Sequence, residues 1–461
     1  MTLNFSHLLW MAVPLGLLGL QSAASAQLSQ PAATVSTSIL PATSDTTVIQ
    51  QADQFNILGG QSSNGATPNV VHQFQEFNLG TADAANFVID PDVANVISLI
   101  NDLQPSTING LLKLTSSDPN VASAANLFLV NPAGIVFGEN MSLNLPAGLT
   151  ATTASGLLFE DLYRLSIDGS VSEIALRDST AATKTGVATI QNLTGDPNGY
   201  FFVAEATSTA ALDPLSPELP SGSIHNQARL QVSPQATVTL IGSYIQNDGV
   251  IVASGGTVNL VAVSGDSLLR LSQAGNLLSL DLTATDTPTS LSSTDVPLRL
   301  TGGHNQGATQ IEITRDGSQL LTSPPPLTPD TGKILVRGTI DVSDENVQGT
   351  VNIVGEQINL IGSDIHADSA QQAGTISIGN RPANSNVNSE YVLIDRNSTL
   401  SADSTLPADS TIGSGGVIQI RATDTVRFYG EATATGANTT LDGTVILDAG
   451  EDLDIRKPTA R

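Results

Sequence analysis

Short strands that recur at a regular spacing constrain the fold of this chain more than any other feature of its sequence. Apolar and polar residues alternate over four-residue stretches bounded by Gly, Asn or Asp, a pattern typical of half-buried β-strands. Several stretches open with Gly and two β-branched residues, and their spacing is 25 residues from Gly349 to Gly374 and 27 from Gly416 to Gly443. The predicted strands are 237–240, 257–260, 310–313, 333–336, 350–353, 375–378, 417–420 and 444–447.

A self-similar repeat of this length predicts a solenoid, in which each coil buries its inward face on the next. We therefore predict an all-β fold, a right-handed parallel β-helix. A second repeat, TLIGSYI at 239–245 and NLIGSDI at 359–365, supports it. The Gly residues suit tight corners, where φ is positive or backbones approach closely. The signatures of leucine-rich repeats (LxxLxLxxN) and of calcium-filled rolls (GGxGxDxUx) are missing, which disfavours those solenoids.

Two segments interrupt the repeats. Residues 90–103 (DPDVANVISLINDL) carry apolar residues at helical spacing after an Asp-Pro start, which predicts one short amphipathic helix that caps or flanks the solenoid. Residues 266–330 are rich in Leu, Ser and Thr and end in the Pro-rich stretch 323–330. We interpret this stretch as an insertion or a domain boundary.

The N-terminus predicts export. Residues 8–20 form an apolar run, and Ala24-Ser25-Ala26 is a small-x-small cleavage signal, so residues 1–26 are predicted to be a secretory signal peptide. The run is too short for a permanent membrane anchor. The mature chain is then expected in the periplasm and beyond.

Composition excludes several functions. The chain has 17 Lys and Arg against 43 Asp and Glu, a formal net charge of −26, which repels phosphate backbones and argues against nucleic-acid partners. No Cys is present, so disulfides, thiolate metal sites and cysteine nucleophiles are excluded.

No motif for catalysis or metal binding emerges. Four His residues follow the signal peptide without HxH, HxxxH or HExxH spacing, and GxSxG, Walker A and GxGxxG are missing. Acidic groups near Arg337 or Arg396 leave open a β-helical lyase or glycosidase, although solvated corner carboxylates are the simpler interpretation. We therefore predict no catalytic, cofactor-binding or metal-binding residue and no enzyme activity. The His residues are His72, His225, His304 and His366, and the acidic groups are Asp341, Asp344, Glu345, Asp364, Asp368, Asp448, Glu451, Asp452 and Asp454.

Residues 45–170 carry a series of stretches in a characteristic order. NILGG at 56–60 is followed by VHQFQEFNL at 71–79, ANF at 85–87 and STING at 106–110. The longest stretch is 125–154, ANLFLVNPAGIVFGENMSLNLPAGLTATTA. Together they resemble the two-partner secretion domain at the N-terminus of filamentous haemagglutinin-like exoproteins, and cyanobacterial members are the most similar.

This resemblance implies a β-helical exoprotein with an N-terminal capping and secretion domain. It also implies an outer-membrane barrel partner with POTRA domains, which recognises the domain in the periplasm before the chain reaches the cell surface or the medium. The expected organisation is a signal peptide at 1–26, a secretion domain at 27–175, and further β-helix repeats at 176–461 with the insertion at 266–330.

The family motif NPNGI corresponds here to Asn131, Pro132, Ala133, Gly134 and Ile135, with Ala in place of the second Asn. Its companion NPNL is echoed only loosely by DPNV at 118–121. Pro fixes φ early in a turn, Gly accepts positive φ, and Asn caps with its side chain. Two interpretations are compatible: a structural corner of one coil, and a corner that also shapes the region docking with the transporter.

Three functions remain open from the sequence. The first is a surface-exposed or released exoprotein that acts as an adhesin, with a carbohydrate or protein ligand. The second is a β-helical carbohydrate-active enzyme, which the scarcity of aromatic residues disfavours. The third is the stalk of a larger or truncated exoprotein.

Overall fold

The computed structural model describes residues 35–160, 162–173, 188–203, 220–265, 267–271, 277–282, 310–313, 319–322, 331–379, 389–407 and 410–456. These residues belong to one compact unit, Thr34–Arg461. Within the described ranges every regular element is a strand except one 3₁₀ turn, η1 (Ile190–Asn192). The same ranges contain no helix of the length and hydropathy needed to cross a membrane.

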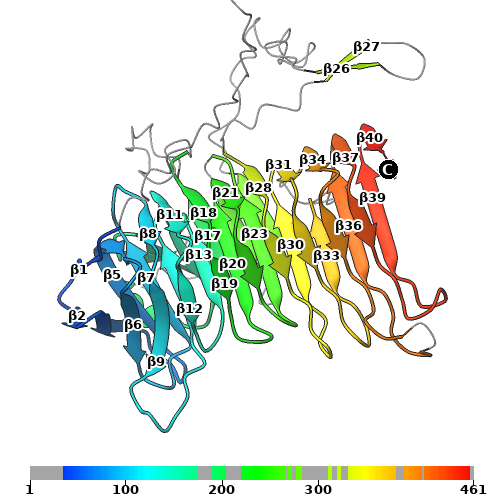
Figure 1. Cartoon of the computed structure of the whole chain (residues 1–461). Coiled ribbons are helices and arrows are strands. Elements are labelled where there is room, and N and C mark those ends of the chain that lie inside the picture. Colours follow the sequence, from blue (N-terminus) through cyan, green and yellow to red (C-terminus); the bar gives the residue numbers. More distant parts are fainter. Residues whose placement is uncertain are drawn as a thin grey trace, which may run out of the picture. The chain divides into compact units, whose positions relative to one another are not determined.

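The chain winds in coils, and each coil from Asn95 to Thr433 contributes one strand to each of three faces (Figure 1). The first face is a 12-stranded sheet and the second a nine-stranded sheet. The third face consists of a five-stranded sheet followed by a six-stranded one, which meet where β12 contacts β19. Beyond the first strands, every pairing within these faces is parallel, so the predicted all-β parallel β-helix is confirmed.

The strands of each face follow chain order. The 12-stranded sheet contains β1 (Ser38–Pro41), β4 (Gln61–Ser62), β5 (Asn69–Asn78), β7 (Asn95–Ile100), β10 (Asn126–Val130), β13 (Leu149–Thr152), β20 (Thr237–Gly242), β23 (Thr257–Ala262), β30 (Thr350–Val354), β33 (Thr375–Ile378), β36 (Val417–Ala422) and β39 (Thr444–Ala449). The nine-stranded sheet contains β8 (Ser106–Ile108), β11 (Gly134–Phe137), β18 (Ser223–Asn226), β21 (Tyr244–Asn247), β28 (Lys333–Val336), β31 (Gln357–Leu360), β34 (Tyr391–Ile394), β37 (Thr425–Phe428) and β40 (Asp452–Ile455). The third face contains β2 (Thr46–Gln51), β3 (Gln54–Gly59), β6 (Ala84–Ile89), β9 (Leu111–Ser116) and β12 (Ser142–Asn144), then β19 (Arg229–Gln231), β22 (Val250–Val252), β29 (Thr339–Asp341), β32 (Asp364–His366), β35 (Thr399–Ser401) and β38 (Glu431–Thr433).

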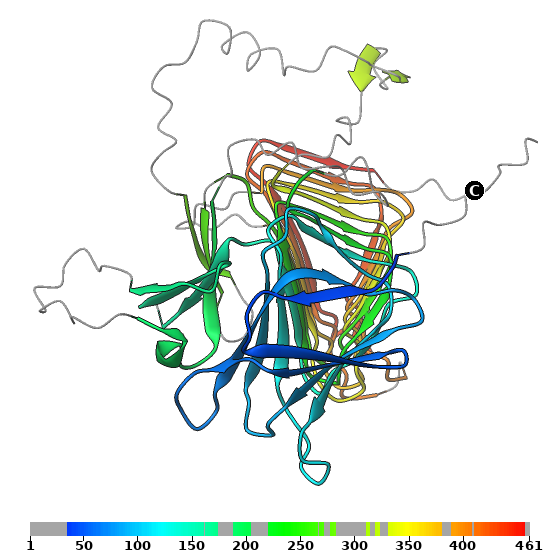
Figure 2. The ribbon, with the colours of Figure 1, turned by 90° about the vertical axis from the view of Figure 1, so that its left-hand side faces the viewer.

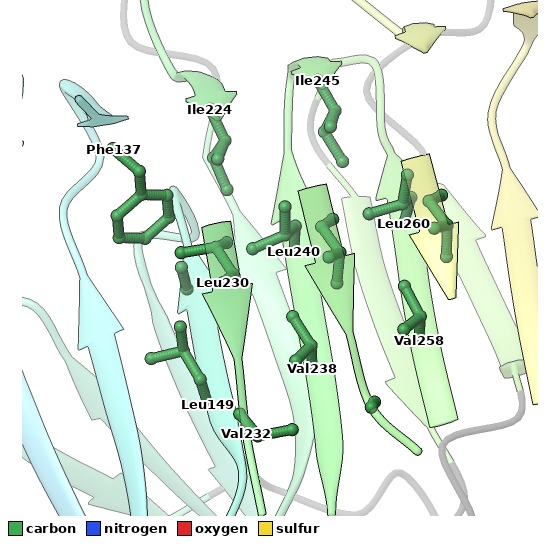
Figure 3. Close-up of a cluster of buried hydrophobic side chains, with 14 of the residues drawn as sticks. Phe137, Leu149, Ile224, Leu230, Val232, Val238, Leu240, Ile245, Val258 and Leu260 are labelled. Carbon is green, nitrogen blue, oxygen red and sulfur yellow. The ribbon is translucent and has the colours of Figure 1, made fainter. Parts of the chain in front are cut away.

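The main core fills the space enclosed by the three faces. Because side chains alternate along a strand and register is kept from coil to coil, one apolar position stacks on its counterpart in the next coil. Leu149, Val238 and Val258 are such a row, and Figure 3 shows it facing side chains of the second and third faces. Each fully buried aliphatic side chain contributes about 1.5–3 kcal/mol.

The glycines of the Gly-Thr-Val repeats are required by close approach between coils. A Cβ on Gly374 would lie 2.1 Å from the carbonyl oxygen of Gly349, and a Cβ on Gly443 would lie 2.0 Å from that of Gly416. None of these four residues has a positive φ. Of the two roles predicted from the sequence, close backbone approach therefore applies here.

Antiparallel strands cover the N-terminal end of the coils. β1 and β4 pair antiparallel with β5, and β2 pairs antiparallel with β3. We call β1–β4 the N-terminal cap. It provides the first parallel strands with paired neighbours, so it protects sheet edges that would otherwise attract foreign strands.

A further six-stranded antiparallel sheet, here called the outer sheet, packs on the outward face of the 12-stranded sheet (Figure 2). It has its own apolar core, in which Leu157, Phe159 and Tyr200 meet Ile97, Leu99 and Phe128 of the 12-stranded sheet. Its strands are β14 (Gly156–Phe159), β15 (Tyr163–Ser166), β16 (Val171–Glu173), β17 (Pro197–Phe202), β24 (Ser267–Leu271) and β25 (Leu277–Leu282).

The outer sheet is built from two excursions that leave the coils at equivalent places. The first follows β13 and ends at β18, and the second follows β23 and ends at β28. Coil stacking continues across both, because β13 pairs with β20 and β23 pairs with β30. The second excursion overlaps the predicted insertion at 266–330, whose described parts are β24, β25 and the hairpin of β26 (Gln310–Ile313) and β27 (Gln319–Thr322).

The helix predicted at residues 90–103 is wrong. The segment forms a turn and then β7, in which all six residues are buried. Val96 and Ile100 point into the main core, whereas Ile97 and Leu99 point into the core of the outer sheet. A strand buried on both faces has a near-continuous apolar sequence, which loses the alternation that distinguishes strands from helices.

All eight strands predicted from the sequence are confirmed as strands, although 310–313 belongs to the antiparallel β26–β27 hairpin and not to a coil. The two related stretches at 239–245 and 359–365 occupy different corners. The first joins the 12-stranded to the nine-stranded sheet, and the second joins the nine-stranded sheet to the third face. The signal peptide at 1–26 and the Pro-rich stretch at 323–330 lie outside the described residues.

Candidate functional site

The predicted secretion motif forms the corner between β10 and β11. Asn131 is fully buried, while Pro132 and Ala133 are half-buried at the turn. The Asn131 side-chain oxygen accepts the Ala133 amide at 3.0 Å, and its backbone carbonyl accepts the Gly134 amide at 3.1 Å. This is an Asx turn, in which the side chain mimics a turn of backbone, as the residue types predict.

Asn131 also joins three coils. Its side-chain amide donates to the Gln104 carbonyl at 3.2 Å and to the Ser106 hydroxyl at 3.0 Å, both in the preceding coil. Its backbone amide donates to the Thr152 carbonyl at 3.0 Å in the following coil. The residue is therefore a clamp as well as a turn former, and a replacement deprives the buried Ser106 hydroxyl and the half-buried Ala133 amide of this partner.

Gly134 and Ile135 continue the corner into the core. Gly134 has φ +137°, and a Cβ there would lie 3.1 Å from the Ser223 carbonyl oxygen and 3.3 Å from the Pro105 Cβ. Ile135 is fully buried and pairs in register with Ile224 of β18. All four predicted motif residues thus lie together, with Asn131, Gly134 and Ile135 inside and Pro132 at the surface.

An apolar surface adjoins this corner. Leu103, on the connection before β8, is 78% exposed, and Pro105 is half-buried against Gly134. Pro132 and Ala133 continue the surface on the next coil. We call Leu103, Pro105, Pro132 and Ala133 the apolar corner.

The loose companion motif at 118–121 forms a different corner, between β9 and β10. The Asp118 carboxylate accepts the Asn120 amide at 2.9 Å, so this corner is also an Asx-type turn. It joins the third face to the 12-stranded sheet, and Val121 is 46% exposed. The two motifs therefore share turn chemistry but not position.

Sequence reasoning missed an asparagine ladder at the start of three successive strands. The Asn95 amide donates to Asn69 at 2.8 Å, and the Asn126 amide donates to Asn95 at 3.0 Å. Asn69 also donates to the carbonyls of Leu193 and Gly195, which ties the first coil to the connection before β17. The signal was present in the sequence, because each Asn directly precedes an apolar strand.

The scattered His and acidic residues form local pairs. The Nε2 of His225 lies 2.8 Å from Asp248, and Arg337 lies 3.7 Å from the same carboxylate, which was not among the acidic groups named from the sequence. Burial raises the pKa of Asp248, but hydrogen bonds from His225 and Gln246 and the charge of Arg337 outweigh it and hold that pKa below its ordinary value. The pair is a structural link between the coils of β18, β21 and β28.

Three other candidate carboxylates accept backbone amides at corners. Asp341 accepts the Ser343 amide at 3.0 Å, Asp344 accepts those of Asn346 and Val347, and Asp368 accepts that of Asp403 at 2.7 Å. Asp454 accepts the Tyr429 hydroxyl and pairs with Arg456, while Arg396 is exposed. Among the described residues, no group of three or more His, Asp or Glu could hold a metal ion.

The model of the TPS secretion domain family matches residues 32–317. Among solved structures, the chain is similar to the HMW1 secretion domain from Haemophilus influenzae, with 13% identity, a TM-score of 0.43, and coverage of 92% of this chain and 100% of that one. It is also similar to a filamentous hemagglutinin secretion domain, with 12% identity, a TM-score of 0.36, and coverage of 91% and 99%. No curated protein matches the chain.

Proposed function

Because the chain belongs to the TPS secretion domain family, we propose that an outer-membrane barrel with POTRA domains exports it and that it then acts as a non-catalytic adhesin at the cell surface. Membership makes the chain a two-partner secretion exoprotein that crosses the outer membrane with a partner transporter, and it confirms the resemblance predicted from residues 45–170. The observation that carries the proposal is the family match over more than half of the chain.

We propose the apolar corner as the docking site for the transporter. Leu103 is the most exposed large apolar side chain among the described residues, and a partner that covers it gains the free energy of removing its apolar area from water. The buried clamp of Asn131 holds Gln104 and Pro132 of neighbouring coils in fixed relation, so the surface is ordered before a partner arrives. Preorganisation of this kind reduces the entropic cost of binding.

The non-catalytic role is supported by how the acidic side chains are used. Carboxylates that could have formed a glycosidase pair instead accept backbone amides of their own or neighbouring corners. A general acid needs a free carboxyl with a raised pKa opposite a second carboxylate. A surface carbohydrate or protein ligand remains the proposed target.

Co-expression with a candidate transporter in a host with an outer membrane tests the export route. Deletion of residues 45–170 is expected to abolish the protein outside the cell. The matched control deletes residues 350–374, a complete repeat that contains β30, β31 and β32, and is expected to leave export intact because stacking can resume in register. Undiminished release of the 45–170 deletion would refute the proposal.

A further inference from the structure

His72 occupies an unusual place for a titratable residue. It lies on β5, is fully buried, and points into the main core near the N-terminal cap. Its ring centroid lies 5.6 Å from that of Phe87 and 6.2 Å from that of Phe74. The ring is closely packed against Gly60, because a Cβ added to Gly60 would lie only 3.0 Å from the imidazole Cε1.

Only one ring nitrogen of His72 has a partner. Nδ1 lies 3.1 Å from the hydroxyl of Thr46, which belongs to β2 of the cap and is itself buried. Nε2 has no hydrogen-bond partner among the described residues. The same holds for the hydroxyl of Ser98, which is the register neighbour of His72 on β7.

No charged group faces the imidazole from the elements packed against it. The neighbours are Thr46 on β2, Phe74 on β5, Phe87 on β6 and Ser98 on β7, with Gly60 before β4. The nearest acidic residue in sequence to Thr46 is Asp45, and its carboxylate is exposed and accepts the Gln61 side chain at 2.6 Å. A positive charge on His72 therefore has no counter-ion.

The contacts define which form of the ring fits. Of the two neutral tautomers, the Nδ1–H form can donate to Thr46 and leaves Nε2 as a lone pair, whereas the Nε2–H form would bury a donor without a partner. Protonation adds an N–H donor and a charge at Nε2 with nothing to accept or balance them. Burial accordingly lowers the pKa of His72 to about 4.

We propose that His72 is an acid-sensitive latch, which fastens the N-terminal cap to the first coil through Thr46 and releases it when the imidazole takes up a proton. The open or unfolded form has an ordinary His pKa of about 6.5. Between about pH 6.5 and 4 the open form binds the proton and the closed form does not. The stability from His72 is therefore complete above about pH 6.5 and is lost as the pH falls toward 4, by on the order of 100-fold in the closing equilibrium.

The first test is side-chain NMR of ¹⁵N-histidine in the full-length chain. We expect His72 to remain a neutral Nδ1–H tautomer at pH 5 in the folded protein, with His366, which is partly exposed on β32, as the reference signal in the same sample. A folded protein in which His72 is already protonated at pH 6 would overturn the latch. This measurement needs no variant.

The second test compares the pH dependence of chemical unfolding for the wild type, His72→Leu and the control His366→Gln. The wild type and the control are expected to lose on the order of 100-fold more in the folding equilibrium than His72→Leu between pH 7 and pH 4.5. Equal losses in all three proteins would overturn the latch. If His72→Leu does not fold, the NMR result stands as the test.

The third test locates the part of the chain that opens first when the pH falls. Hydrogen exchange at pH 5, corrected for intrinsic rates, is expected to rise in β2 and β3 before it rises in β33 and β36. Opening that begins in β33 and β36 would contradict a latch at the cap. The latch is a property of the folded chain, so its failure would leave the proposed export route unaffected.

Discussion

The N-terminal and C-terminal coils solve the same stacking problem with different chemistry. The first coils (blue to cyan in Figure 1) have an aromatic core, in which the ring centroid of Phe77 lies 5.1 Å from that of Phe74 and 6.2 Å from that of Phe87. The coils from residue 331 onward (yellow to red) stack rows of Ile, Val and Leu, such as Val351, Ile376 and Ile418. Rows of aliphatic residues are sufficient to stack one coil on the next. The aromatic core of the first coils is therefore not needed for stacking alone.

Polar groups divide the two regions less sharply. The first coils contain the clamp of Asn131, the ladder from Asn69 and the buried His72, and the outer sheet covers their outward face. In the later coils Asp344 caps its own corner, whereas Asp368 and Asp403 accept hydrogen bonds from the next coil. Polar bridges between coils thus occur in both regions, and the aromatic core and the buried His72 are what distinguish the first coils.

The largest effect is expected from the aromatic core. Phe87→Ala should lower the free energy of unfolding by about 3–5 kcal/mol, because it removes contacts with Phe77 and His72 and leaves a cavity. Ile376→Ala in a later coil is the comparison, and its damage should stay local because coils interact with nearest neighbours. Hydrogen exchange that rises throughout the chain in both variants would remove the distinction between the two regions.

Asn131→Ala should destabilise the protein by about 2–3 kcal/mol, because the Ser106 hydroxyl and the Ala133 amide lose their partner. Secretion should fall with it, measured as the ratio of released to cell-associated protein. The control is Asn397→Ala, an exposed corner residue of a later coil whose side-chain amide donates to Asp395 at 3.3 Å. Normal secretion of Asn131→Ala would reduce the motif to a local structural corner.

Gly374→Ala should cost about 2 kcal/mol, because the new methyl group would meet the Gly349 carbonyl and force the coils apart. Gly362→Ala is the matched control, since its Cβ would meet open space and only its φ of +61° opposes the change. Thermal unfolding of the two variants distinguishes close approach from backbone strain. A larger loss for Gly362→Ala would contradict the stacking argument.

The smallest change in stability is expected at the apolar corner. Leu103→Ser should alter the free energy of unfolding by no more than about 0.5 kcal/mol, because the side chain is 78% exposed. Export and binding to the transporter should nevertheless decrease. Val445→Ser, which replaces a 40% exposed apolar residue on β39, is the control for surface polarity. Equal export of both variants would remove the apolar corner from the docking model.

Sequence patterns predicted the strands and turns whose own residue types indicate the structure that they adopt in the folded chain. Strands such as 375–378 alternate cleanly because one face meets the core and the other meets solvent or polar neighbours. The motif at Asn131 was likewise predictable, because turn chemistry depends on residue type. The role of Asn131 as a clamp across coils was not, since Ser106 and Gln104 become its neighbours only after stacking.

The outer sheet explains why residues 95–100 were predicted to be helical and not a strand. Nothing local to residues 95–100 reveals a second apolar core, because its other half comes from residues 156–165, 200–202 and 269. Without that partner, buried residues on both faces of β7 resemble helical spacing. Long-range cover of a strand therefore hides its identity from any window of neighbouring residues.

The two excursions have an evolutionary consequence. β21 pairs with β28 and β23 with β30 even though 70 residues, 263–332, lie between the end of β23 at Ala262 and the start of β28 at Lys333. Hydrogen bonding between coils thus fixes only the positions at which the chain leaves the coils and returns to them. It does not limit the length of the segment between these positions. Such junctions are positions at which a new domain or a foreign epitope can be inserted while the strands of the coils keep their register.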